Sequence, residues 1–190
     1  MNAIEVIVLV LVITLFVNYV GTSTSEVSFV KSKVDGARYL VRTMHDMQKA
    51  ADILARLAAK LERIVASFLE KHPKDRDAQR LRDNYDKGSL SEGTEDSKFT
   101  SYSVNKGEKI VMCLRSRDGN MKLADENVLA YVAIHELGHL MTKEIGHTST
   151  FWKNFKRLLQ HAIDTGEYKR VDYKKKPVRY CGMDIKSSVV

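Results

Sequence analysis

Cysteine is scarce in this sequence, and basic residues are missing from its N-terminal part. The 190 residues include only Cys113 and Cys181, which are too few for the disulfide scaffold of a small secreted domain. One bridge between them is an alternative, but we expect two buried free thiols. Hydrophobic residues make up 44% of the chain and charged residues 29%. This composition excludes a disordered protein and fits one globular domain with an appendage.

Because residues 1–30 contain no Lys or Arg, the positive charge lies entirely in the rest of the chain. The formal net charge is +7. All 31 basic residues follow residue 30, whereas Glu5 and Glu26 precede it, so residues 31–190 carry a net charge of +9. A basic body suits an acidic partner, either nucleic acid or an anionic membrane surface. From charge alone we favour a solvated surface without such a partner.

The N-terminal segment is strongly apolar. From Val6 to Val17 every residue except Thr14 is apolar, and with its neighbours this run approaches the roughly 20 residues that cross a bilayer. A cleaved signal peptide would need a basic start and a small-residue cleavage site, and both are missing. A buried core segment would need a larger protein to cover it. We therefore expect a transmembrane anchor at residues 1–21, followed by a linker at 22–34.

The flanking charges orient the expected anchor. Glu5 lies near the start of the membrane segment at residues 3–21, whereas Lys31, Lys33 and Arg38 follow that segment. The positive-inside rule then predicts a single-pass membrane protein with its C-terminal body on the cytoplasmic side. The chain has no Asn-x-Ser/Thr glycosylation sequon, which agrees with this side. A cytoplasmic body also favours reduced cysteines.

A helical region is expected over residues 35–98. Its main element is a long helix at 35–71, in which apolar residues alternate spacings of four and three. These residues are Leu40, Met44, Met47, Ala51, Leu54, Ala58, Leu61, Val65 and Phe68. We favour packing of this stripe on the domain's own core; the alternative is docking of a second copy or a partner protein. Asp75 is the expected N-cap of a shorter helix ending at Tyr85, and residues 86–98 are expected to form a polar loop.

A β-hairpin is expected next. Residues 101–104 and 109–115 are strand-like, and Gly107 supplies a positive φ in the Asn-Lys-Gly-Glu turn between them. Asp125 is a candidate N-cap for a helix at 126–143. Because this helix is apolar on most sides, we expect it to be buried.

The strongest functional signal is the sequence His-Glu-Leu-Gly-His at residues 135–139. His135 and His139 are four residues apart, so both imidazoles project from one helix face and can bind one Zn²⁺. Glu136 is the expected general base, which takes a proton from the water that zinc activates. Gly138 has no side chain, so another element can pack closely against the helix.

A catalytic zinc site needs a third protein ligand and an open fourth position. Gly146 is suited to reversing the chain after the helix, so we expect His147 to return to the metal. The alternatives are His161 or an acidic residue of the last helix and, less favoured, a Cys181 thiolate. Support for the oxyanion is expected from zinc and from one of three tyrosines, among which the sequence does not choose. These are Tyr168, Tyr173 and Tyr180.

Four short motifs follow one another within residues 99–165: Asp118-Gly119, the His-Glu-Leu-Gly-His sequence, Gly146-His147 and Phe151-Trp152. In this order they resemble the WLM and SprT-like zinc metallopeptidases. That family usually has five residues between its second and third histidines, and this sequence has seven. The stretches "TSYSVNKGEKI", "GHTSTFWKNF" and "YCGMDI" are also similar to membrane-anchored metallopeptidase-like proteins of large DNA viruses.

The resemblance implies an α+β fold with a zincin-like core at residues 99–190, in which a small, mostly antiparallel sheet packs on helices. It also implies that the strand at 109–115 lies along the cleft and pairs with an extended substrate backbone. Similar family members act on protein crosslinked to DNA. The basic tail at 167–180 is therefore a candidate nucleic-acid contact, but we favour a solvated hairpin, and the expected anchor argues against a role on DNA.

Together these features predict a membrane-anchored zinc metalloendopeptidase that acts on proteins or peptides. His135, His139 and His147 hold the metal, and Glu136 is the general base. The alternative is a non-catalytic scaffold on the same fold, for instance a virion component, that binds capsid or membrane proteins or a second copy through the long helix. The presence of Glu136 favours the enzyme, since purely structural zinc sites are usually closed by four protein ligands.

Overall fold

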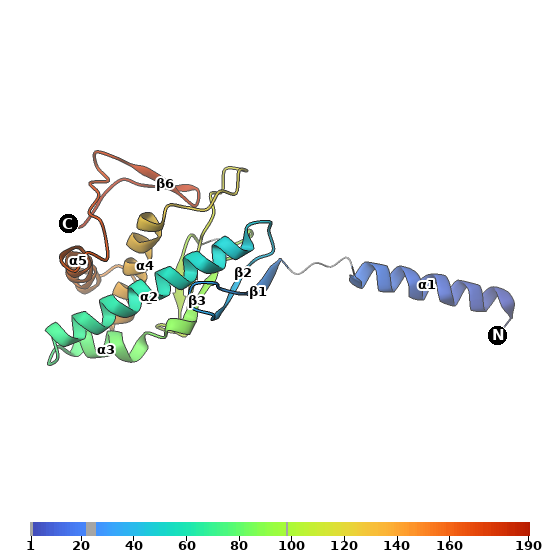
Figure 1. Ribbon diagram of the computed structural model, residues 1–190, viewed down its shortest axis with the longest axis horizontal. Coiled ribbons are helices and arrows are strands. Elements are labelled where there is room, and N and C mark those ends of the chain that lie inside the picture. The colour runs from blue at the N-terminus through green and yellow to red at the C-terminus, as the bar shows by residue number, and fades with distance from the viewer. Residues whose placement is uncertain (1, 22–25, 98) are drawn as a thin grey trace.

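The computed structural model describes residues 2–21, 26–97 and 99–190, without the side chains of residues 3 and 15–21. Residues 22–25 of the expected linker lie outside the described residues. The fold is α+β, as predicted (Figure 1). Its elements are α1 (Ala3–Gly21), β1 (Val27–Lys31), β2 (Arg38–Arg42), α2 (Met47–Lys71), α3 (Arg76–Asn84), η1 (Lys87–Ser89), β3 (Leu90–Glu92), β4 (Tyr102–Val104), β5 (Lys109–Met112), α4 (Glu126–Met141), α5 (Ser149–Asp164), β6 (Val178–Tyr180) and β7 (Met183–Ile185).

The N-terminal helix α1 is the element expected to cross a membrane. Among the described residues, no helix is both long and apolar enough to cross a bilayer. The predicted anchor at residues 3–21 is therefore contradicted, and so is the single-pass placement of the body on the cytoplasmic side. The described hydrophobic side chains of α1 are 43% to 72% exposed.

A β-hairpin precedes α2, where the sequence pattern predicts a linker and the start of the long helix. β1 and β2 pair antiparallel, with Val27 opposite Arg42 and Lys31 opposite Arg38. Tyr39 and Val41 are buried on the inner face of β2. This alternation of two is the strand period, and short apolar runs fit either period. The long helix accordingly begins at residue 47 and not at 35.

The stripe on α2 packs on the domain's own core, as favoured from the sequence. Its residues from Ala51 to Phe68 are buried together with residues of α4 and α5. The expected helical region and the expected core domain thus share one hydrophobic core. The N-cap of α3 is confirmed, because the Asp75 side chain accepts hydrogen bonds from the backbone N–H groups of Asp77 and Ala78.

The main sheet has three strands in the order β3-β5-β4. β4 and β5 form the predicted antiparallel hairpin. β3 pairs parallel to β5, so the sheet is mixed, and β3 lies in the segment predicted as a loop. The resemblance implied that the strand at 109–115 lies along the cleft, and this expectation is wrong. β5 is the central strand of the sheet, and the cleft is lined by β4.

A buried ion pair explains why β3 was not recognised from its sequence. Glu92 accepts a hydrogen bond from Arg115 at 2.8 Å, and both side chains are almost fully buried. Arg115 also pairs with Asp46 at 2.7 Å. A buried charge needs such partners, and both partners of Arg115 are distant in the sequence. A three-residue strand ending in glutamate therefore carries no strand signal of its own.

A disulfide joins Cys113 and Cys181, so the prediction of free thiols is wrong. The end of β5 and the β6–β7 turn lie side by side, with 6.3 Å between the two Cα atoms, a distance that suits a bridge. The bond ties the C-terminal hairpin, in which β6 and β7 pair antiparallel, to the main sheet.

Gly107, in the β4–β5 turn, has a φ of +123°, and a Cβ there would lie 2.0 Å from the carbonyl oxygen of Asn84. We expect Gly107→Ala to lower the free energy of unfolding by about 3 kcal/mol, from backbone strain and a displaced contact, measured by urea denaturation. Gly119→Ala is the matched control, since Gly119 has φ +85° and open space around it. It should lose only about 1 kcal/mol. Equal losses in the two variants would contradict this account.

Candidate metal centre

The helix that carries the His-Glu-Leu-Gly-His sequence is fixed by a capped start and by burial. The Asp125 side chain accepts hydrogen bonds from the N–H groups of Asn127 at 2.9 Å and Val128 at 3.2 Å, which confirms the predicted N-cap. α4 then continues to Met141, two residues short of the prediction. Most of its residues are buried in the shared core, so one limited face is left for polar groups.

Close packing of α5 against α4 depends on Gly138, as expected from the sequence. A Cβ at Gly138 would lie 3.1 Å from Phe151 and 3.3 Å from Phe155. This packing brings the Phe151 ring against His139, stacked with 4.3 Å between ring centroids. Phe155 meets His135 edge-on at 5.2 Å. The two helical histidines are therefore held in place by aromatic side chains.

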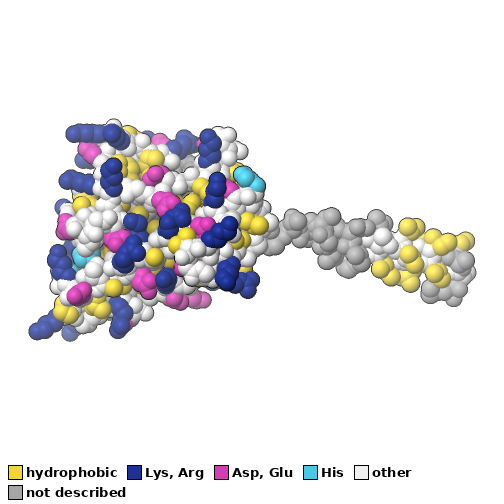
Figure 2. Space-filling model, in the orientation of Figure 1, with side chains coloured by type: hydrophobic (Ala, Val, Ile, Leu, Met, Phe, Trp, Pro, Cys, Tyr) yellow, Lys and Arg dark blue, Asp and Glu magenta, His cyan; other side chains and the backbone are white. Residues whose placement is uncertain are grey.

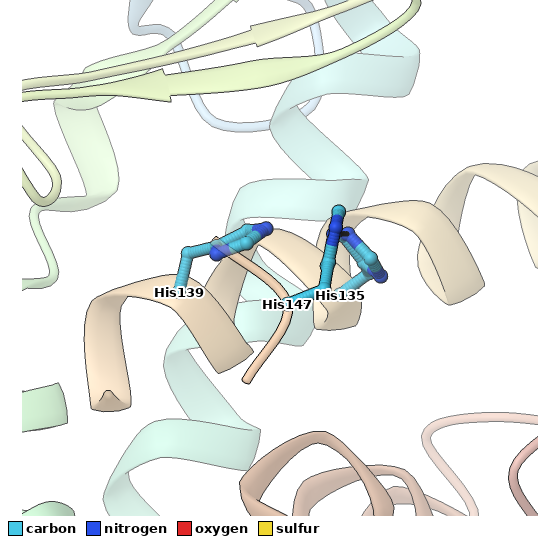
Figure 3. Close-up of side chains that lie close together, drawn as sticks. All are labelled: His135, His139 and His147. Carbon is cyan, nitrogen blue, oxygen red and sulfur yellow. Dashed lines mark hydrogen bonds between the residues drawn. The ribbon is translucent and has the colours of Figure 1, made fainter. Parts of the chain in front are cut away.

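Three histidines converge beside α4 (Figure 3). His135 and His139 project from the helix, and His147 comes from the following loop, where Gly146 at φ +84° reverses the chain. Their potential ligand atoms all lie within 4.8 Å of one another, and the Nε2 atoms of His135 and His147 are 3.0 Å apart. Ligands of one tetrahedral Zn²⁺ are separated by about 3.3 Å, given the usual bond lengths. The cluster therefore fits a single metal ion.

The helical imidazoles are in the protonation state that a metal needs. Burial lowers the pKa of His135 to about 3 and that of His139 to about 4. His139 and His147 add to the first shift, and His147 and Lys106 add to the second. Both rings are thus neutral at pH 7 and present free lone pairs, which metal binding requires.

Glu136 lies beside the cluster and is only 4% exposed. Burial raises the pKa of its carboxyl group to about 7, and hydrogen bonds from the side chain and the backbone of Ser103 partly oppose this rise. Ser103 belongs to β4, so the carboxyl group sits between α4 and that strand. A carboxyl group in this position can take up or release a proton within the cleft.

The histidines and Glu136 line an open cleft of about 790 Å³. α4 forms one side of it, and β4 with its flanking residues, from Thr100 to Lys106, forms another. The segment from Ile145 to His147 and the C-terminal hairpin complete the lining. The site is thus accessible to a large ligand.

Of the three candidate tyrosines, only Tyr180 lines this cleft. Its hydroxyl group is 2.9 Å from Ser101 Oγ. Tyr168 and Tyr173 are buried elsewhere and hydrogen-bond to each other at 3.3 Å. Burial raises the pKa of Tyr180 far above its ordinary value, so its hydroxyl group stays protonated and can donate.

The alternative third ligands lie apart from the cluster. His161 Nε2 is 2.8 Å from Ser67 Oγ at the interface of α5 with α2, and Cys181 is consumed by the disulfide. Sequence reasoning missed Ser103 and Lys106, which both line the cleft. Alternation along β4 put Ser101 and Ser103 on one face, but no local signal showed that this face meets α4.

No family model matches the chain. The uncharacterized protein R325 of Acanthamoeba polyphaga mimivirus is 32% identical over 189 residues, which cover 96% of this chain and 94% of that protein. The chain belongs to the family of this viral protein. The uncharacterized proteins 136R of invertebrate iridescent virus 6 and 042R of invertebrate iridescent virus 3 match 69 residues each, at 38% and 39% identity. These shorter matches cover 36% of this chain, and 38% and 42% of the two proteins.

All three relatives are viral, in agreement with the expected likeness to viral proteins. Among solved structures, Wss1 from Saccharomyces cerevisiae is similar with a TM-score of 0.49 and 18% sequence identity, over 66% of this chain and 89% of that one. A similarity at this level assigns neither activity nor substrate to the chain.

We expect the full chain to hold about one Zn²⁺, measured by elemental analysis after removal of loosely bound metal. His147→Ala should bind it at least 10-fold more weakly, because two ligands remain. His161→Ala is the matched control and should retain it. Loss of zinc from the His161 variant, with retention in the His147 variant, would show that the third ligand lies elsewhere.

Proposed function

We propose that this chain is a zinc-dependent metallopeptidase that hydrolyses peptide bonds in extended polypeptide segments. One observation carries the proposal: three histidines that converge on one point stand beside a buried glutamate in an open cleft. Within the described part of the chain, the metal-ligand group has three members. A structural zinc site is usually closed by four protein ligands, whereas a catalytic site keeps one position for water or substrate.

Each residue of the site has its own role in the proposed hydrolysis. His135, His139 and His147 would hold the metal through imidazole nitrogens. When bound, zinc would supply Lewis acidity toward a water molecule and the carbonyl group of the scissile bond. Glu136 accepts a proton from the attacking water and delivers it to the leaving amine. Ser103 of β4 faces Glu136 and keeps the pKa of its carboxyl group below the value that burial alone would give.

The substrate would lie along β4. This strand pairs with β5 on one side only, and its residues line the cleft on the other side. An extended peptide can add to such an edge through backbone hydrogen bonds, which confer affinity with little dependence on sequence. Because Ser103 and Glu136 line the same cleft, a peptide paired at this edge passes next to the general base.

Tyr180 is the best placed of the three tyrosines to support the oxyanion. Its hydroxyl group lies in the cleft lining and is held by Ser101. A preorganised donor of this kind stabilises the charge that develops on the carbonyl oxygen in the transition state.

We expect Glu136→Gln to reduce cleavage of a labelled, denatured protein such as casein by at least 100-fold. The amide cannot accept the proton, yet it keeps the size of the side chain, so zinc content should stay at the wild-type level. Cleavage at the wild-type rate would rule out Glu136 as the general base. A wild-type chain that binds zinc but cleaves none of a panel of unfolded proteins would favour the scaffold alternative.

We expect Tyr180→Phe to lower kcat by about 10- to 100-fold with little change in KM, because the lost donor acts on the transition state. Tyr173→Phe is the matched control, since this tyrosine is also buried and hydrogen-bonded but lies outside the cleft. Its kcat should match that of the wild type. The same kcat in both variants would exclude Tyr180 from this role.

A further inference from the structure

The third histidine is carried by a segment that burial does not hold. α4 ends at Met141, and residues 143–147 are exposed, with the Ile145 side chain 89% accessible. Gly146 has no neighbouring atoms within 4 Å of where a Cβ would lie. Two ligands are thus fixed by a buried helix. His147 stacks on the Trp152 ring with 5.4 Å between centroids, and its position otherwise depends on whatever fixes this segment.

Lys106 provides that attachment from the β4–β5 turn. Its ammonium group donates hydrogen bonds to the carbonyl oxygens of Thr142 and Glu144, at 2.8 Å each, and approaches that of His139 at 3.4 Å. An ammonium group has three donors and no acceptor, so these contacts match its capacity. A cation is also favourable at a helix C-terminus, where the carbonyl groups carry partial negative charge.

The turn that presents Lys106 packs against the end of α3. Asn105 and Lys106 both adopt positive φ, at 47° and 58°, and a Cβ at Gly107 would lie 2.0 Å from the carbonyl oxygen of Asn84. The turn that carries the ammonium group is therefore in close contact with the rest of the domain.

We propose that Lys106 is a positioning residue for the metal site: it anchors the segment after α4 and so holds His147 in reach of the two helical histidines. The proposal rests on the metal site described above. Lys106 lies two residues after the end of β4, so one turn links the strand proposed to bind substrate to the loop of the third ligand. The role is indirect, because Lys106 touches backbone carbonyl groups and not the metal.

Asn84 offers a matched control for a purely structural role. Its side-chain amide donates to the carbonyl oxygen of Leu140 at 2.9 Å, one residue before α4 ends. Asn84→Ala therefore removes a cap from the same helix end without releasing the segment from residue 142 to residue 147.

The test is the Zn²⁺ affinity of the full chain, measured by competition with a chelator of known affinity. We expect Lys106→Met to weaken binding about 10-fold, at the low end of the effect of residues that orient ligands. Lys106→Arg, which keeps a cation and its donors, should restore most of the affinity. The zinc affinity of Asn84→Ala should stay within about twofold of that of the wild type. This should hold even if urea denaturation shows that Asn84→Ala and Lys106→Met lose similar stability in their zinc-free forms.

A double-mutant cycle separates positioning from general destabilisation. In a His147→Ala background, Lys106→Met should cause no further loss of zinc affinity, because the ligand it positions is gone. Equal losses in both backgrounds would overturn the proposal, as would wild-type affinity in Lys106→Met.

Should the Met variant not fold, Lys106→Gln retains an uncharged donor, and the same criteria apply. A wild-type chain that binds no zinc would overturn the proposed function as well, whereas His147-dependent zinc binding that is insensitive to Lys106 would overturn only this inference.

Discussion

Burial of α4 on all sides but one is the constraint on which the rest of the structure depends. Leu137 and Leu140 are fully buried in the shared core, and Gly138 is pressed against α5. This packing fixes the rotation of the helix about its axis, so the polar side chains of its His-Glu-Leu-Gly-His sequence all face the cleft. Buried polar groups need partners, and for His135 and Glu136 these lie in a single cleft with β4 opposite. The fold thus positions the polar side chains of the candidate site by leaving only one face of α4 unburied.

The features that could be predicted from sequence are those that depend on residues close together in the chain. Histidines four apart on an apolar helix must share a face, and a capping aspartate such as Asp125 identifies the helix start. Gly146 signals a reversal in its own right, so the return of His147 needed no knowledge of distant segments. The β4–β5 hairpin was recognisable for the same reason, because Gly107 and the alternating strands are adjacent in the chain. Much of the candidate site is local in this sense.

What escaped prediction depends on distant partners. β3 is stabilised by the Glu92–Arg115 pair, and Lys106 acts on carbonyl groups over thirty residues further along the chain. No pattern within a short window contains such contacts. At the start of the long helix a local pattern was misleading instead. The helical repeat of apolar residues was extended back across β2, whose five residues fit both the helix period and the strand period. Figure 2 shows a related point for charge: basic and acidic side chains are interspersed on this face, an arrangement that a net charge of +7 does not reveal.

The bond between Cys113 and Cys181 gives the molecule a covalent ring. The two cysteines are 68 residues apart, and all of α4, His147 and α5 lie between them. A peptide bond broken anywhere inside this ring does not divide the chain, because both pieces remain joined through sulfur. A molecule nicked by itself or by a neighbouring copy would therefore keep its full mass under denaturing conditions and separate into fragments only after reduction.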